Sequence, residues 1–148
     1  MKTALIFGAL AAMAAPALAT DDAIMTRKSF MWSNGASAGL AVGMMKNEIE
    51  YSPAAGNAVL KSFMATSLAF GDYFPDGTDQ GDTRASPKIW EDRAGFDAAL
   101  AEFQEASASG AQAGGREGPA DLAAFQAAVG PILNTCNSCH EEYQLSRQ

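Results

Sequence analysis

Apolar residues recur every three or four positions along parts of this chain, a spacing that predicts amphipathic helices. Four stretches carry the pattern: 22–48, 52–70, 86–109 and 119–143. Ser52-Pro53 and Ser86-Pro87 each place a capping residue before a proline, which favours a helix start at both points. Gly71 stands where the second helix is expected to end.

The fourth stretch has the most regular pattern, and it includes the two cysteines of the chain. Its inward positions step by three or four residues: Leu122, Phe125, Val129, Ile132, Cys136, Cys139 and Tyr143. Both cysteine side chains are therefore expected on the face that packs into the protein, and His140 lies one position round from it. Gly130-Pro131 interrupts the stretch and predicts a kink.

The segments between these stretches are rich in turn residues, and the chain shows neither a strand pattern nor a repeat. A short link over 47–53 makes the first two helices antiparallel neighbours, whereas 71–85 is long enough to cross an end of the molecule. Composition is rich in Ala and Met and poor in β-branched residues, which also favours helices. The sequence therefore predicts an all-α fold with one domain.

The first 19 residues have the pattern of a secretory signal peptide. A basic Lys2 precedes an apolar run from Ala4 to Ala15, and Ala17-Leu18-Ala19 fits a cleavage site. A membrane anchor is the alternative, but the run is too short to span a bilayer and Pro16 breaks it. We expect a mature domain over 20–148, with no later segment apolar enough for membrane insertion.

The chain is acidic, with a formal net charge of −7 that includes the positive Lys2 of the leader. An acidic balance argues against nucleic acid and against anionic membrane surfaces as partners. It is compatible with a basic protein partner.

Cys136-Asn137-Ser138-Cys139-His140 is a C-x-x-C-H motif, which is typical of c-type haem attachment. Two thiols at this spacing add to the two vinyl groups of one haem, and the adjacent imidazole binds its iron. His140 is the only histidine of the chain, so a histidine ligand to that iron has to be this one.

Other interpretations of the motif fit less well. A structural zinc site needs four Cys or His ligands, and the chain has three such residues. A thioredoxin-like redox pair needs a strand–helix–strand context, which is missing from the pattern here. A disulfide between Cys136 and Cys139 would close too small a loop to stabilise much.

Taken together, these features resemble the class II c-type cytochromes, the cytochrome c′ family. The resemblance covers the whole mature chain, and the motif's position near the C-terminus is its most distinctive part. Three further segments carry it: RKSFM over 27–31, YFPDGTD over 73–79 and TRASPKIWEDRAGF over 83–96. It implies an antiparallel up-down-up-down four-helix bundle with one covalently bound haem c.

The resemblance also implies roles for residues of the first helix and of the long loop. Arg27 falls where the family places a basic residue near the haem propionates, although most arginines are solvated surface charges. Met31 falls at the distal side of the iron, either as sixth ligand or as a packing residue. Thr83 and Arg84 lie in a segment similar to the family's haem edge.

The leading hypothesis is a periplasmic monohaem electron carrier whose iron is held by His140 and Met31. The alternative is a five-coordinate, high-spin cytochrome c′ that binds nitric oxide or carbon monoxide. A helical bundle with an unused C-x-x-C-H is a third interpretation. The sequence shows no catalytic constellation, so we expect no enzyme; redox proteins, a small gas ligand and a second copy in a homodimer are the expected partners.

Overall fold

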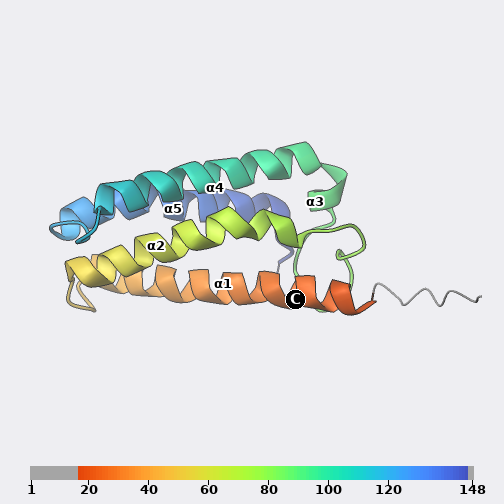
Figure 1. Cartoon of the computed structure of the whole chain (residues 1–148), viewed down its shortest axis with the longest axis horizontal. Helices are drawn as coiled ribbons and strands as arrows, with labels where there is room; N and C mark the ends of the chain where they lie inside the picture. Colours follow the sequence, from red (N-terminus) through yellow and green to blue (C-terminus); the bar gives the residue numbers. More distant parts are fainter. Residues whose placement is uncertain (1–16, 147–148) are drawn as a thin grey trace, which may run out of the picture.

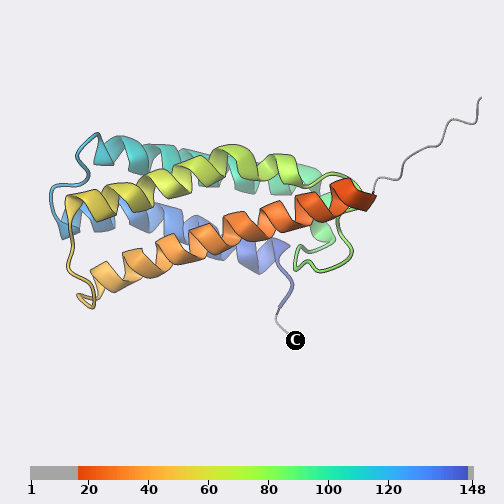
Figure 2. The same cartoon turned by 60° about the horizontal axis from the view of Figure 1, so that its bottom comes forward.

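The computed structural model describes residues 17–146, with side chains from Asp22 onward. Four long helices lie side by side and alternate in direction along the bundle (Figures 1 and 2). The elements are α1 (Ala17–Met45), α2 (Pro53–Ala69), the 3-10 helix η1 (Phe70–Tyr73), α3 (Lys88–Glu91), α4 (Arg93–Gly114) and α5 (Leu122–Tyr143). The predicted all-α four-helix bundle is confirmed. The expected signal peptide, 1–19, lies mostly outside the described residues.

Helix α1 ends at Met45, three residues before the predicted end. Asn47 has a φ of 58°, a left-handed conformation that asparagine tolerates better than most residues. Its amide donates to the Met44 carbonyl at 3.1 Å, and the Glu48 amide donates to Gly43 at 2.9 Å. These bonds close the last turn of the helix.

Helix α2 begins as predicted. The Ser52 side chain accepts a hydrogen bond from the Ala55 amide at 3.2 Å, and Pro53 occupies the first helical position. The helix ends at Ala69, and η1 then carries the chain past Gly71.

The third predicted helix is two helices. Asp92 interrupts it with a φ of −125° and a ψ of 63°, and its carboxylate accepts from the Gly95 amide at 3.1 Å as the cap of α4. Helix α4 then continues to Gly114, so the expectation of a loop beginning at Gly110 was wrong. A Cβ at Gly110 would lie 3.0 Å from the Ala128 carbonyl of α5, so this glycine lets two helices approach closely.

Helix α5 starts at Leu122, capped by the Asp121 carboxylate at 2.8 Å from the Ala124 amide. It remains one continuous helix through Pro131 and carries both cysteines and the histidine. After it, the chain pairs with the long loop: the Ser86 amide donates to the Tyr143 carbonyl at 3.0 Å, and Leu145 donates to Arg84 at 2.8 Å. The loop is thereby fixed beside the end of α5.

Two clusters of buried side chains form the core. The larger fills the half of the bundle that lies toward the α1–α2 and α4–α5 connections: Ala41, Met44, Val59, Leu60, Phe63, Phe103, Phe125, Ala128, Val129 and Ile132. The other, called here the aromatic cluster, consists of Phe70, Phe74, Ile89, Phe96, Leu100 and Tyr143. Its rings meet mostly edge to face, and Phe74 and Phe96 have centroids 4.7 Å apart.

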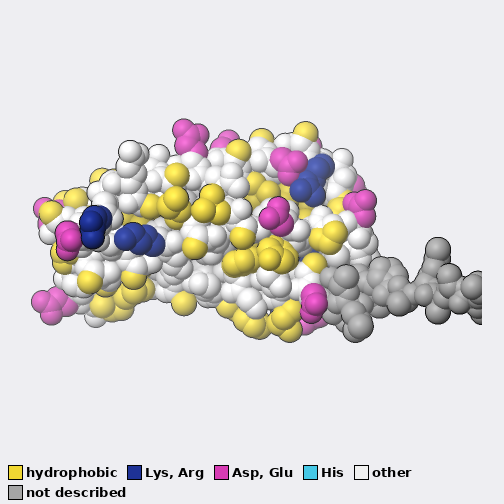
Figure 3. Space-filling model, viewed as in Figure 1, with side chains coloured by type: hydrophobic (Ala, Val, Ile, Leu, Met, Phe, Trp, Pro, Cys, Tyr) yellow, Lys and Arg dark blue, Asp and Glu magenta, His cyan; other side chains and the backbone are white. Residues whose placement is uncertain are grey.

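The outside of the bundle carries scattered charge and some exposed apolar side chains. Figure 3 shows hydrophobic side chains in patches along α1 and α2. Met25, Trp32 and Leu68 are the most exposed large apolar residues of these two helices. No helix in the described part of the chain is long and apolar enough to cross a bilayer.

Candidate haem-binding site

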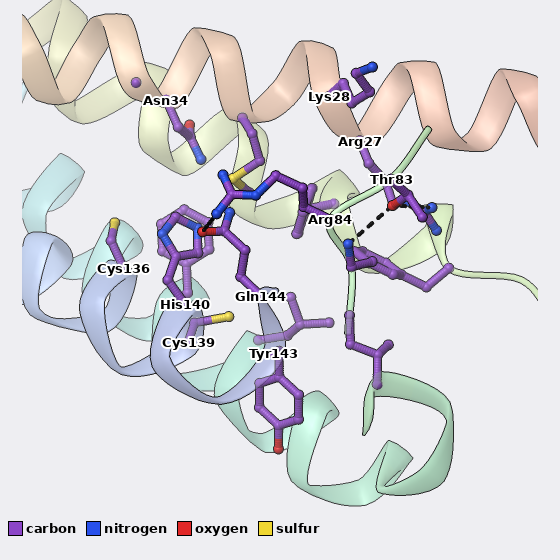
Figure 4. Close-up of a pocket in the computed structure, with 18 of the residues that line it drawn as sticks. Arg27, Lys28, Asn34, Thr83, Arg84, Cys136, Cys139, His140, Tyr143 and Gln144 are labelled. Atoms are coloured by element: carbon purple, nitrogen blue, oxygen red, sulfur yellow. Dashed lines mark hydrogen bonds between the residues drawn. The ribbon is translucent and has the colours of Figure 1, made fainter. Parts of the chain in front are cut away.

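A cavity of about 630 Å³ lies between α1, α5 and the long loop. Its size falls within the range of about 300–1,000 Å³ that is usual for small-molecule and cofactor sites. Figure 4 shows labelled side chains of α1 on one side and those of the C-x-x-C-H motif on the other. The aromatic cluster forms the inner wall.

Helix α5 brings the three motif side chains to this cavity. Cys136, Cys139 and His140 all line it, because positions three and four apart share one helix face. Both cysteines are half-buried free thiols, and the Cys136 thiol donates to the Ile132 carbonyl at 3.3 Å. His140 lies toward the open side and is exposed. The prediction that both sulfurs face inward is therefore confirmed.

The surroundings of the cavity favour the neutral forms of the Cys136 and Cys139 thiols and of the His140 imidazole. Burial, reinforced by the neighbouring Cys136, raises the pKa of the Cys139 thiol to about 11. Burial also raises the pKa of the Cys136 thiol. Although part of His140 reaches the surface, its pKa is lowered, first by the partial burial of the side chain and then by the positive charge of Arg84. A neutral imidazole is the form that binds a metal ion.

Arg27 is buried at the α1 wall of the cavity, with 4% of its surface exposed. Its guanidinium donates to Thr78 twice at 2.7 Å, to the side-chain oxygen and to the carbonyl. It also donates to the Tyr73 carbonyl at 3.1 Å and to the Thr83 hydroxyl at 3.3 Å. The Phe74 ring lies 4.8 Å away in cation–π geometry. Arg27 is thus no solvated surface charge.

The charge of Arg27 has only neutral partners among the described residues. The ion pairs of this part of the chain join Lys28 to Asp82, Lys88 to Glu142 and Arg93 to Asp97. Burial lowers the pKa of Arg27, although a guanidinium stays charged at neutral pH. A buried cation beside a cavity, with no carboxylate paired to it, fits the anionic propionates of a haem.

Thr83 and Arg84 line the cavity from the long loop. The Thr83 hydroxyl accepts hydrogen bonds from the Arg27 guanidinium at 3.3 Å and from the Ala85 amide at 3.1 Å. It therefore helps to hold the Arg27 side chain and the loop backbone in place. Arg84 is exposed and donates to Gln144 at 3.1 Å and to the Leu145 carbonyl at 2.7 Å. It therefore ties the loop to the end of α5 on the side where His140 lies (Figure 4).

Met31 lies one turn beyond Arg27 and lines the same cavity. It is half-buried and packs against the aromatic cluster. Packing of this kind is the usual role of a core methionine.

Sequence reasoning missed Asn34 and Gln144, which also line the cavity. Asn34 is buried, and its side-chain oxygen has no hydrogen-bond partner in the described structure. Its position, seven residues after Arg27 and three after Met31, is the signal that would have found it.

The donor set fits a prosthetic group better than a bare ion. Within the described residues, no three His, Cys, Asp or Glu side chains gather as a metal site would require. The two thiols, the neutral imidazole and the buried guanidinium surround a largely apolar space of suitable size. These residues fit a haem.

Comparisons with known proteins agree with this geometry. The family model described as "Cytochrome C'" matches residues 22–144. A relative named cytochrome c-556 from Rhodopseudomonas palustris is 32% identical over 150 residues, covering 97% of this chain and 97% of its own. The structure of cytochrome c′ from R. palustris superposes with a TM-score of 0.77 at 29% identity, covering 86% of this chain and 98% of the other.

A further similar structure is a nitric oxide complex of a variant of cytochrome c′ from Alcaligenes xylosoxidans. It has a TM-score of 0.74 at 26% identity and covers 86% of this chain and 97% of the other. The fold, the cavity and these matches lead to one conclusion. The chain belongs to the cytochrome c′ family, whose members carry one covalently attached haem c.

Proposed function

We propose that this protein is a periplasmic c′-type cytochrome whose haem has one face open to a small ligand such as nitric oxide or carbon monoxide. The observation that carries the proposal is the arrangement of Cys136, Cys139 and His140 across a cavity from the unpaired charge of Arg27. When bound, the haem supplies an iron that alternates between ferrous and ferric states and offers a position to a ligand.

Each residue has a distinct task in this proposal. Cys136 and Cys139 fix the haem to α5 through thioether bonds, and His140 supplies the proximal imidazole. Arg27 neutralises a propionate from within the protein, where its charge is little screened. Arg84 holds the loop against α5 and places a positive charge near His140.

The side chains that α1 contributes to the cavity are consistent with an open haem face. Met31 is packed against aromatic side chains, so a packing role accounts for its position. One of the similar structures is the nitric oxide complex of a variant of cytochrome c′ from Alcaligenes xylosoxidans, so a variant of a relative takes such a ligand.

A second candidate is a low-spin electron carrier in which Met31 binds the iron. One observation favours it: Met31 lines the same cavity as the C-x-x-C-H motif, from the opposite helix. A thioether opposite an imidazole raises the reduction potential and suits electron transfer.

Visible absorption of the purified holoprotein separates the two candidates. The open-face proposal expects high-spin ferric and ferrous spectra and a carbon monoxide difference spectrum without any substitution. Met31→Ala should change the spectra little, and Met25→Ala, an exposed methionine of the same helix, serves as the control. Low-spin spectra that become high-spin only in Met31→Ala would establish the second candidate instead.

Attachment is tested separately. Denatured wild-type protein should retain the mass of one haem, whereas Cys136→Ser with Cys139→Ser should release it to acid–acetone extraction. His140→Ala should lose the histidine-ligated spectrum. Haem retained by the double variant would refute the attachment residues.

Location and partners complete the proposal. Export through a leader at 1–19 should yield a mature N-terminus at Thr20, which mass spectrometry of the periplasmic fraction would detect. Redox proteins are the expected macromolecular partners. The exposed apolar side chains of α1 and α2 are where a homodimer would form, and sedimentation velocity measures that state.

A further inference from the structure

Gly35 lies in the part of α1 that borders the cavity, one turn beyond Met31. Helices α1 and α5 run antiparallel, so the later residues of α1 lie opposite the earlier residues of α5. Figure 4 shows Asn34, the residue before Gly35, toward the same end of the cavity as Cys136, and Arg27 toward the other end. Gly35 therefore borders the half of the cavity that contains the first thiol of the C-x-x-C-H motif.

The packing of the protein gives no reason for a glycine at this position. A Cβ added at Gly35 would meet no other part of the protein within 4 Å. Gly110 differs in this respect, because its Cβ would lie 3.0 Å from the Ala128 carbonyl. Glycine destabilises the interior of a helix relative to alanine, so Gly35 has a cost that no contact within the protein explains.

The residues of α1 that share the cavity face with Gly35 differ in size. Met31 and Ala38 lie on this face at steps of four and three residues from Gly35. Met31 packs against the aromatic cluster, and Ala38 packs against the larger core cluster. The wall that α1 forms thus carries a long side chain at Met31, none at Gly35 and a methyl group at Ala38. It is lowest at Gly35.

The Cys136 thiol supplies an independent reason to expect a ligand there. A thioether bond at this sulfur would bring the edge of the haem ring into the half of the cavity that Gly35 borders. Carbon atoms of packed groups approach one another to about 3.5–4.0 Å. A Cβ projects about 1.5 Å from its Cα, so a ring packed on the backbone at Gly35 would overlap with any side chain larger than hydrogen.

We propose that Gly35 is a positioning residue that lets the haem ring lie directly against the backbone of α1 on the Cys136 side. Glycine is the residue that permits such a close approach between a backbone and a ligand. A side chain at position 35 would press on the ring and displace it from α1. The inference rests on the covalent haem and not on the proposed open face, since it holds with or without Met31 as an iron ligand.

The test replaces Gly35 in the holoprotein with alanine and with leucine. Gly39→Ala and Gly39→Leu are the matched controls: Gly39 lies one turn further along α1, a Cβ there would also meet nothing within 4 Å, and it is not among the residues that line the cavity. Circular dichroism in the Soret region reports how the haem sits among the surrounding side chains. This signal should change in Gly35→Ala, change more in Gly35→Leu, and stay as in wild type in both Gly39 variants.

Urea unfolding of the same holoproteins should give opposite signs at the two positions. Alanine and leucine are better helix formers than glycine, so both Gly39 variants should have a midpoint equal to or above that of wild type. Gly35→Leu should lower the midpoint by about 1 M, as expected when a well-filled site is overpacked. A glycine that served only the helix would give the same result at both positions and would leave the Soret signal unchanged.

Two results would overturn the assignment: equal Soret signals in Gly35→Leu and Gly39→Leu, or a midpoint of Gly35→Leu at or above that of wild type. If Gly35→Leu does not fold, the Soret signal of Gly35→Ala against Gly39→Ala decides in the same way. Failure of the open face is distinguishable, because a low-spin wild type would refute it and leave this comparison unaffected. Wild-type protein without a Soret band would refute both.

Discussion

Replacing Arg27 with methionine tests whether a buried, unpaired charge holds the long loop to α1. Methionine keeps much of the apolar stem and removes the guanidinium. The loss includes two hydrogen bonds to Thr78 at 2.7 Å and one to the Tyr73 carbonyl at 3.1 Å. Hydrogen bonds to a charged group contribute about 1.5–3 kcal/mol each, and they are not additive, so we expect Arg27→Met to lower the unfolding free energy by about 3–5 kcal/mol.

Urea unfolding followed by far-ultraviolet circular dichroism measures this loss. With a slope of about 1–3 kcal/mol per molar urea, the midpoint should fall by more than about 1 M. Arg27→Lys keeps the charge but lacks the planar fork, so its loss should be about half as large. Arg116→Met, an exposed arginine in the α4–α5 connection, is the matched control and should stay within about 0.5 kcal/mol of wild type.

The comparison of Arg27→Met with Arg116→Met shows whether the loss of stability depends on the hydrogen bonds of Arg27 or follows from replacing any arginine. If Arg27→Met loses less than about 1 kcal/mol, or no more than Arg116→Met, the hydrogen bonds to the loop do not contribute as argued. The α1 wall of the cavity would then need another explanation.

Three further predictions concern the elements that position the site. Asp121→Ala removes the cap of α5 and should lower stability by about 1 kcal/mol without changing the visible spectrum. Gly118 has a φ of 95°, and a Cβ at this position would overlap the Pro53 carbonyl. Gly118→Ala should therefore lower the unfolding free energy, measured in urea, by about 1–3 kcal/mol more than the control Gly115→Ala, whose Cβ would meet nothing within 4 Å. In the haem-free chain, folding raises the pKa of the Cys139 thiol from its ordinary 9.0 to about 11. Between pH 9 and 11 the folded state therefore binds more protons than the unfolded state, so the unfolding free energy should fall as the pH rises through this range. An unfolding free energy that stays constant over this range would contradict the burial of Cys139.

The helices could be predicted because periodicity and capping act locally. Ser52-Pro53 specifies the start of α2 by itself, since the serine side chain and the fixed φ of proline both act within one turn. The break at Asp92 was missed because an aspartate on the outer face of a helix and one that caps the next helix have the same sequence pattern. Only the contact to Gly95 distinguishes them.

Glycines were the other source of error. Gly110 reads as the beginning of a loop, yet in the bundle it lies inside α4, where α5 passes close to it. The preference of an isolated residue for turns is weaker than the packing of two helices, and only the packed bundle shows which effect prevails.

The candidate site was partly predictable, because some of its residues are close together in the sequence and others are not. The motif at Cys136–His140 is local, so its placement on one face of α5 followed from spacing. The burial of Arg27 depends on Thr78 and Tyr73, which are about fifty residues away in the chain. No local pattern encodes such a contact.

The most direct test of the open haem face is the rate at which carbon monoxide binds to the ferrous wild-type protein in stopped-flow experiments. An open α1 side predicts an observed rate that increases in proportion to carbon monoxide concentration, with the same behaviour in Met31→Ala. A rate that saturates at high concentration in wild type, and loses that limit in Met31→Ala, would show that Met31 must leave the iron first and would contradict the account.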